Sequence, residues 1–367
     1  MTHYYTKVCA NIYRGVYSKS REATREYNEC KKKIAEMINA GSEKEIIFTS
    51  GATHSINLAK NLLINSNIIL PGQTILISQL EHHSNMIPWM ELISKGISVE
   101  AVTIDSGSNL DMEDAGEKIR KRPALIAITH ASNVTGELVH LEEVSRMSRE
   151  NNSILLVDAA QSISHQFVDV KRLGIDMLAF SSHKMLGPTG LGVLYVKEAL
   201  LKRLRPFFFG GGTVKSVTLN DNYQLLDYPE VFEPGTPNIG AVYGLKEAAD
   251  FICNIGYKDI SEYEEQLCKY MLDKTGGLRK VKIYGSADTK YRIPTFSFSV
   301  DGFSPEEVAM ILSKKFNIAV RSGMHCAQPA VEAMDRNGLI RASLTFYNTF
   351  DEIDYFINAI NTICEEF

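Results

Sequence analysis

The sequence lacks any long apolar run. None of its 367 residues belongs to a stretch near the roughly 20 apolar residues that a bilayer-spanning helix needs, and residues 1–10 carry no signal-like segment. Strong net charge is also lacking, because 39 Lys and Arg residues against 44 Asp and Glu residues leave only −5. This balance provides no general attraction to nucleic acid or anionic lipid. We therefore expect a soluble, cytosolic protein that acts on small molecules, with neither nucleic acid nor membrane as a partner.

Cysteine is scarce, and no Cys-x-x-Cys pair occurs. The six cysteines are scattered at Cys9, Cys30, Cys253, Cys268, Cys326 and Cys364. This pattern favours reduced thiols over a disulfide framework or a zinc site. The adjacent His82 and His83 do not predict a metal site either, because neighbours on an extended segment point to opposite sides and no second ligand cluster follows.

Short β-rich runs and helical stretches alternate along much of the chain. The runs are 45–48, 74–78, 99–104, 124–129, 154–157 and 177–180, and the helical stretches include 21–40 (with Ser20 as its expected cap), 54–63, 112–121 and 141–150. Such alternation, with strands apolar on both faces, predicts an α/β fold with a mostly parallel sheet covered on both sides. Its active site is expected at the carboxyl ends of the strands. The run 192–196 follows the preceding strand too closely for a helical crossover, so it should pair antiparallel or lie at an edge.

The length predicts two domains. Helices over 240–255 and 260–274 are separated by Gly256, which we take as the boundary between a large domain, 1–255, and a smaller α+β domain, 256–367. In the smaller domain, 293–300 alternates as a strand. Ser304 and Thr349 begin capping-box sequences for helices that run to residues 316 and 367.

The stretch 181–192, which reads Ser-Ser-His-Lys-Met-Leu-Gly-Pro-Thr-Gly-Leu-Gly, contains a candidate nucleophile, Lys184. A lysine becomes nucleophilic when it is desolvated or lies near another cation, and a position just after Phe180 and beside His183 offers both. A lone loop lysine is more often simply solvated. Asp158 favours the nucleophile over the solvated lysine. A pyridoxal phosphate site typically combines a lysine that forms an imine with an aspartate that holds the pyridinium nitrogen. Alone, Asp158 could equally cap a following helix.

Several polar residues stand where they could serve such a site. Gln161 could reach the ring hydroxyl, one histidine of the pair could stack on the ring, and Asn133 lies at a strand tip. The small-residue loop 49–53 opens a helix, where free amides and the helix dipole favour an anion.

A further group of candidates lies near the carboxyl end of the chain. Arg321 precedes a glycine-containing turn that carries Cys326, and positive charge near a thiol favours the reactive thiolate, although structural cysteines are commoner. Arg341 precedes a β-like run over 342–347 and could be a bidentate carboxylate clamp or a salt-bridge arginine.

Taken together, these segments resemble the class V aminotransferase family of pyridoxal phosphate enzymes (fold type I), and within it the SufS-like (group II) cysteine desulfurases. The resemblance covers nearly the whole chain. Its motifs, in order, are Glu-His-His-Ser-Asn at 81–85, Thr-His-Ala-Ser-Asn at 129–133, Val-Asp-Ala-Ala-Gln at 157–161, the stretch 181–192, Phe-Glu-Pro-Gly-Thr-Pro-Asn at 232–238, Arg-Ser-Gly-Met-His-Cys-Ala-Gln-Pro at 321–329 and Arg-Ala-Ser-Leu at 341–344.

The resemblance implies a role for each candidate. Lys184 would form the imine with the cofactor, Asp158 would pair with the pyridinium nitrogen, Gln161 would bond the ring hydroxyl and His82 would stack on the ring. The phosphate would be bound by Thr53, Ser181, His183 and, across a homodimer, Thr236 of the partner subunit. Asn133 and Arg341 would hold the substrate carboxylate at the cofactor, with Arg321 nearby, and Cys326 would accept the sulfur.

The implied reaction converts L-cysteine to L-alanine and leaves a persulfide on Cys326. The sulfur would pass to a SufE/SufU-like acceptor protein or a scaffold for iron-sulfur cluster assembly. The alternatives are a selenocysteine lyase, a cysteine sulfinate desulfinase or another class V aminotransferase-like enzyme, or a non-catalytic pyridoxal-binding homologue.

The sequence departs from the family pattern at two places. A short amino-terminal segment with an Asn-Ala-Ala-like motif, which helps to close the family's substrate pocket, has no visible equivalent. Tyr13 stands in Tyr-Arg-Gly-Val-Tyr where SufS-like members tend to have histidine, and Met324 precedes His325 in the cysteine loop. We expect cofactor binding to survive these changes, and substrate specificity and turnover to be the properties they affect.

Overall fold

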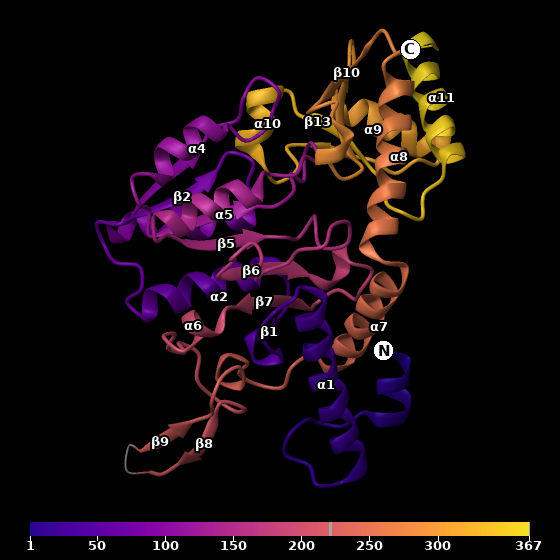
Figure 1. Ribbon diagram of the computed structural model, residues 1–367. Helices are drawn as coiled ribbons and strands as arrows, with labels where there is room; N and C mark the ends of the chain where they lie inside the picture. Colours follow the sequence, from indigo (N-terminus) through magenta and orange to yellow (C-terminus); the bar gives the residue numbers. More distant parts are fainter. Residues whose placement is uncertain (220–221, 367) are drawn as a thin grey trace.

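A seven-stranded sheet forms the centre of the computed structural model, which describes residues 1–219 and 222–366 (Figure 1). The strand order is β1-β7-β6-β5-β4-β2-β3, with β1 (Ile46–Thr49), β2 (Thr74–Ser78), β3 (Ser98–Val102), β4 (Leu125–Thr129), β5 (Ile154–Asp158), β6 (Met177–Ser181) and β7 (Gly192–Val196). Neighbours from β6 to β3 are parallel, and β7 is antiparallel to both β6 and β1. The expected α/β fold with a mostly parallel sheet is confirmed. The expectation that the run 192–196 pairs antiparallel or lies at an edge is confirmed by its antiparallel pairing, and β7 is an interior strand because β1 pairs along its other side.

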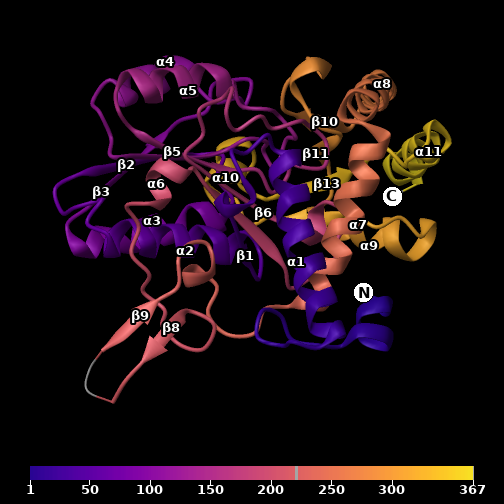
Figure 2. The ribbon, with the colours of Figure 1, turned by 60° about the horizontal axis from the view of Figure 1, so that its bottom comes forward.

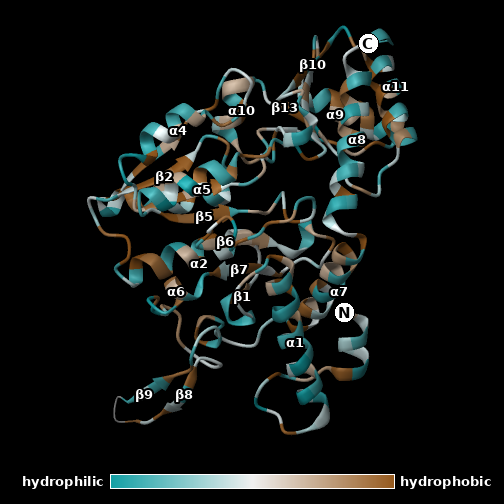
Figure 3. Ribbon diagram, viewed as in Figure 1, coloured by the Kyte–Doolittle hydropathy of each residue, from teal (hydrophilic) through white to brown (hydrophobic). Residues whose placement is uncertain are grey.

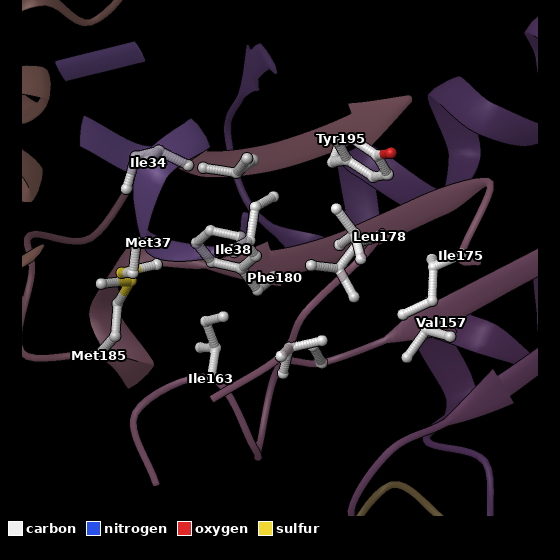
Figure 4. Packing of buried hydrophobic residues seen from close by; sticks show 14 of the residues in the cluster. Ile34, Met37, Ile38, Val157, Ile163, Ile175, Leu178, Phe180, Met185 and Tyr195 are labelled. Carbon is white, nitrogen blue, oxygen red and sulfur yellow. The ribbon is translucent and has the colours of Figure 1, made fainter. Parts of the chain in front are cut away.

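Helices cover both faces of this sheet. One face packs against α1 (Ser18–Met37), α4 (Met112–Ile119), α5 (Leu141–Glu150) and α7 (Ile239–Ile255), and the other against α2 (Ala52–Asn65), α3 (Ile87–Met90) and α6 (Glu198–Leu201). Figure 3 shows apolar strands between these helices. Two hydrophobic cores result, one on each face of the sheet, because successive side chains of a strand point to opposite faces. In β6, Leu178 and Phe180 pack into the core on the α1 side, and Met177 and Ala179 pack into the core on the α2 side. Figure 4 shows Phe180 and Leu178 near Ile38 of the loop after α1.

Helix α1 begins earlier than the sequence predicts. Its N-cap is Tyr17, so the expected cap at Ser20 is wrong. The Ser20 hydroxyl lies inside the first turn and donates a hydrogen bond to the Asn11 carbonyl at 2.8 Å. It thereby ties the amino-terminal segment, which includes the π-helical turn η1 (Tyr4–Val8), to the helix that packs on α7.

A second, four-stranded antiparallel sheet lies toward the carboxyl end, as Figure 2 shows from another side. Its order is β10-β11-β13-β12, with β10 (Val281–Tyr284), β11 (Thr295–Val300), β12 (Arg321–Gly323) and β13 (Leu339–Ser343), and helices α8 (Tyr257–Thr275), α9 (Pro305–Phe316) and α11 (Phe350–Glu366) pack around it. Capping boxes occur at both predicted starts, Ser304 and Thr349. Helix α10 (Gln328–Met334) instead packs into the core of the large sheet through Ala330 and Val331. A domain boundary at Gly256, between α7 and α8, stays a prediction.

A two-stranded hairpin, β8 (Val214–Val217) and β9 (Tyr223–Leu225), projects from the body in both ribbon views (Figures 1 and 2). The sequence did not predict it, because its strands are short and largely exposed. No helix in the described part of the chain is both long and apolar enough to cross a membrane.

Candidate active site

A cavity of about 220 Å³ lies where β4, β5 and β6 end. Thr129, Asp158 and Ser181, the last residues of these strands, all line it. The other lining residues are Ala52, Thr53, His82, Ser84, Ala131, Asn133, Ala160, Gln161, His183 and Lys184. The structure therefore brings most of the predicted cofactor residues together at the expected edge of the sheet. Their individual roles stay predictions.

Lys184 enters this cavity from a single turn, Ser182–Lys184, that directly follows β6. Its side chain is half-buried and has no hydrogen bond or ion pair with the residues that the structure describes. Burial lowers the pKa of Lys184. Asp158 opposes that shift, while Arg341 and Arg321 add to it. The lowered pKa favours the neutral amine that an imine-forming lysine requires.

Asp158 is only 3% exposed at the end of β5. Its Oδ1 accepts a hydrogen bond from Ala160 N at 2.9 Å, and burial raises its pKa while Lys184 opposes the rise. A turn rather than a helix follows at 160–165, so helix capping does not explain this carboxylate. A cationic partner in the cavity would compensate for its burial.

His82 faces the cavity with a fixed ring. Its Nδ1 accepts a hydrogen bond from Ser84 N at 3.1 Å and lies 3.0 Å from Ser84 Oγ. Burial, followed by the charge of Lys184, lowers the pKa of His82 to about 4. The imidazole is therefore neutral near pH 7, as a ring that stacks on a cofactor or relays a proton should be.

The start of α2 forms the anion-binding side of the cavity. Ala52 N donates a hydrogen bond to Ser181 Oγ at 2.8 Å, and Thr53 Oγ1 lies 2.6 Å from Ser84 Oγ. His183 is exposed at the same mouth. The hydroxyls and the amides of a 14-residue helix converge here, which suits a phosphate.

Asn133 joins the cavity to the loop that carries Cys326. It is 4% exposed, and its Nδ2 donates a hydrogen bond to the His325 carbonyl at 2.8 Å. Its buried Oδ1 has no hydrogen-bond partner among the described residues. An unsatisfied acceptor of this kind in a cavity wall fits a ligand that donates a hydrogen bond.

Two arginines on neighbouring strands of the four-stranded sheet lie near this loop. Arg321 of β12 pairs in register with Arg341 of β13, and Arg341 Nη1 donates to the Asn133 carbonyl at 2.7 Å. Arg341 therefore lies within a strand that ends at Ser343, and the predicted run over 342–347 is wrong. Burial lowers the pKa of Arg341 to about 10. Neither arginine forms an ion pair with a carboxylate in the described residues, so the pair is available to an anion.

Cys326 lies beside the first of these arginines. Arg321 Nη2 donates to Cys326 Sγ at 2.9 Å, and the thiol is half-buried. Both His325 and Cys326 adopt left-handed backbone conformations, with φ of 51° and 57°. Non-glycine residues in this region carry strain that concentrates at functional sites.

Thr236 does not reach this cavity. It lines a different cavity of about 490 Å³ together with Tyr13, Arg14 and Glu233. Thr236 therefore does not line the Lys184 cavity of its own chain. Its expected contact with the cofactor phosphate of a partner subunit stays a prediction.

Sequence reasoning missed Glu81, which is fully buried beneath the cavity. Its carboxylate accepts hydrogen bonds from Asn85 Nδ2 at 2.6 Å, Thr129 N at 2.8 Å and the Ser78 hydroxyl. Burial raises its pKa to about 8. Glu81 thus ties the end of β2 to the end of β4. The signal was an acid near the end of an apolar strand, since Glu81 follows β2 by three residues and Asp158 is the last residue of β5.

The residues present fit pyridoxal phosphate. Asp158 would hold the ring nitrogen, Lys184 the aldehyde carbon and the α2 amino end the phosphate, while the unsatisfied Asn133 Oδ1 can accept a hydrogen bond from the bound group.

Comparisons with known proteins agree with this assignment. The family model described as aminotransferase class-V matches residues 1–356. A probable cysteine desulfurase of Pyrococcus abyssi is 40% identical over 99% of this chain and 89% of its own length. A cysteine desulfurase of Escherichia coli is 35% identical over 98% of this chain and 88% of its own length.

Solved structures show the same likeness. The apo structure of a cysteine desulfurase from Thermococcus onnurineus has a TM-score of 0.95 at 38% identity, and the match covers 100% of this chain and 90% of that one. The Escherichia coli cysteine desulfurase CsdA, in an S-sulfonic acid form, has a TM-score of 0.90 at 29% identity, with the same coverage. The chain therefore belongs to the class V aminotransferase family, whose members are pyridoxal phosphate-dependent enzymes.

Proposed function

We propose that this protein is a cysteine desulfurase that converts L-cysteine to L-alanine and takes the sulfur as a persulfide on Cys326. The observation that carries the proposal is the position of the thiol. Cys326 hydrogen-bonds with Arg321, and the residue before it is bonded by Asn133, which lines the Lys184 cavity. One chain thus supplies both an amine for the cofactor and a thiol for the sulfur. The desulfurase relatives support the same activity.

The chain's own groups suit the handling of substrate at such a site. When bound, pyridoxal phosphate supplies an electron sink for the substrate Cα. Lys184, with its lowered pKa, takes the proton from that carbon. Arg341, whose buried Nε has no protein partner among the described residues, binds the substrate carboxylate together with Asn133.

Cys326 then accepts the sulfur as a thiolate. The thiolate attacks the substrate sulfur, a sulfur–sulfur bond forms, and the bond between Cβ and sulfur breaks with its electron pair left on carbon. Protonation of Cβ, and return of a proton to Cα by Lys184, complete alanine. The sum, cysteine plus enzyme thiol giving alanine plus enzyme persulfide, balances without any external oxidant or reductant.

The finer assignments belong to the same proposal. The enzyme is of the SufS-like group, works in the cytoplasm, and passes its sulfur to a SufE/SufU-like acceptor or a scaffold for iron-sulfur clusters. It acts as a homodimer in which Thr236 contributes to the phosphate site of the other subunit. The position of Thr236 in a separate cavity supports this arrangement. We also propose that the large domain, which carries the cofactor residues, ends at residue 255.

The test is incubation of the cofactor-loaded protein with L-cysteine. Alanine should accumulate, and mass spectrometry should locate 32 Da of added sulfur, roughly the mass of one atom, on the peptide that contains Cys326. Cys326→Ala should abolish the persulfide, and Lys184→Ala should abolish the cofactor's covalent attachment. Alanine production from cysteine sulfinate or selenocysteine, without production from cysteine, would assign the protein to the other class V activities. Absence of product from all three would support a non-catalytic homologue.

A further inference from the structure

The two adjacent histidines have different neighbours. His82 lines the cofactor cavity, whereas His83 meets the loop that carries Cys326. His83 N donates a hydrogen bond to the Cys326 carbonyl at 2.7 Å. His83 Nε2 accepts one from Gln328 N, the first residue of α10, at 3.3 Å. His83 therefore binds two backbone groups of the loop, the carbonyl of Cys326 and the amide two residues later.

The Cys326 loop needs such support because its backbone is strained. Two consecutive non-glycine residues, His325 and Cys326, have positive φ. Their two successive carbonyls are bonded from outside the loop, by Asn133 Nδ2 and by His83 N. The Gln328 amide is one of the unsatisfied donors at a helix start, and the His83 ring is the group that accepts from it.

We propose that His83 is a positioning residue for the sulfur acceptor: its imidazole fixes the start of α10 and thereby holds the Cys326 thiol toward the cofactor cavity. The ring acts through the loop and not on the substrate. The inference rests on the proposed function only in taking Cys326 as the sulfur acceptor. Acceptance from an N–H requires an unprotonated Nε2, so the proton of the neutral ring sits on Nδ1.

The chain allows a matched set of variants. In His83→Gln, the amide oxygen can reach the place of Nε2 and accept from Gln328 N. In His83→Asn, the oxygen stops near the place of Nδ1 and cannot. His83→Ala removes the acceptor entirely, while the backbone contact to Cys326 is available in all three variants.

The first readout is amide hydrogen exchange of the Gln328 N–H in the holoenzyme. Exchange should be roughly three- to tenfold faster in His83→Ala and His83→Asn, the effect of losing one hydrogen bond, and near the wild-type rate in His83→Gln. The second readout is the single-turnover rate of persulfide formation on Cys326. It should fall in the same two variants, whereas the KM for cysteine and the cofactor absorption should not change.

Unchanged Gln328 exchange in His83→Ala, or a His83→Gln variant as impaired as His83→Asn, would overturn the proposal. Hydrogen exchange needs no substrate. If the wild-type protein formed no alanine from cysteine, the proposed function would fail, and the exchange data would still decide whether His83 holds the loop.

Discussion

Arg321 and Cys326 form a direct contact, with Nη2 of the arginine 2.9 Å from the sulfur. They lie at opposite ends of a short turn that passes through Gly323, whose φ of 95° needs a glycine. Arg321 is also opposite Arg341 in the small sheet, so the sulfur lies near two positive charges. Sulfur transfer requires a thiolate, and a guanidinium donor in contact with the sulfur is a partner that a thiolate can accept from.

Replacing Arg321 should therefore make the thiol less reactive. In Arg321→Gln we expect Cys326 to be alkylated by iodoacetamide roughly three- to tenfold more slowly at pH 7, because a charge-assisted contact to the thiolate is lost. Arg321→Lys should retain part of the rate. Peptide mass spectrometry can follow Cys326 and the exposed Cys9 in the same sample, and Cys9 should not respond. Equal rates for Cys326 in the wild type and Arg321→Gln would show that the contact does not activate the sulfur.

Asp158 should be essential for turnover but not for attachment of the cofactor. Asp158→Asn keeps the size of the side chain and removes the charge that would hold the ring nitrogen protonated. We expect alanine formation to fall at least about 100-fold, within the range for loss of a major electrostatic contribution. Borohydride reduction and mass spectrometry should still find the cofactor on Lys184. Asp301→Asn, at an exposed position, is the control and should have normal activity.

The sequence predicted the large sheet well because its information is local. Apolar runs between helical stretches mark β2, β4, β5 and β6, and the polar residues that follow parallel strands must meet at one edge. This is why Asp158 and Lys184 could be placed together without a structure.

The sequence did not predict contacts that depend on pairing between distant segments. The interior place of β7 depends on β1, which lies more than a hundred residues earlier. The bond from His83 to Cys326 and that from Asn133 to His325 join segments that are equally remote. A single sequence has no local pattern that specifies such partners. Arg341 was misplaced for the same reason, since its strand is defined by pairing with β11 and β12.

The burial of Glu137 predicts that the free energy of unfolding depends on pH. It is 2% exposed where the loop after β4 meets the segment before β11, and it accepts a hydrogen bond from Ser286 N. Burial raises its pKa to about 7, although Ser286 N–H and Arg292 oppose the shift. The folded protein therefore binds more protons than the unfolded chain between about pH 4.5 and pH 7. Over this window, the contribution of Glu137 to stability falls as pH rises.

The comparison of Glu137→Gln with the wild type isolates this contribution. The wild type should lose up to about 1.4 kcal/mol of unfolding free energy per pH unit from this group, and the variant should lose none of it. Urea unfolding at pH 5 and pH 8 measures the difference. Glu117→Gln changes an exposed carboxyl and should retain the wild-type pH dependence. A pH dependence in Glu137→Gln that equals the wild-type one would mean that Glu137 is ionised throughout.

The separate location of Thr236 predicts complementation between two defective proteins. If Thr236 serves the other subunit, a dimer of Lys184→Ala and Thr236→Ala chains has one intact site, because its active Lys184 and its wild-type Thr236 come from different chains. Refolding or co-expressing an equal mixture should then restore about a quarter of the wild-type sites, since about half of the dimers are mixed. If Thr236 instead served its own chain, every site in the mixed dimer would carry one of the two changes.

Alanine formation by the mixture, compared with the sum of the two variants assayed apart, distinguishes the two arrangements. Size-exclusion chromatography with light scattering supplies the control, because a monomer could not complement.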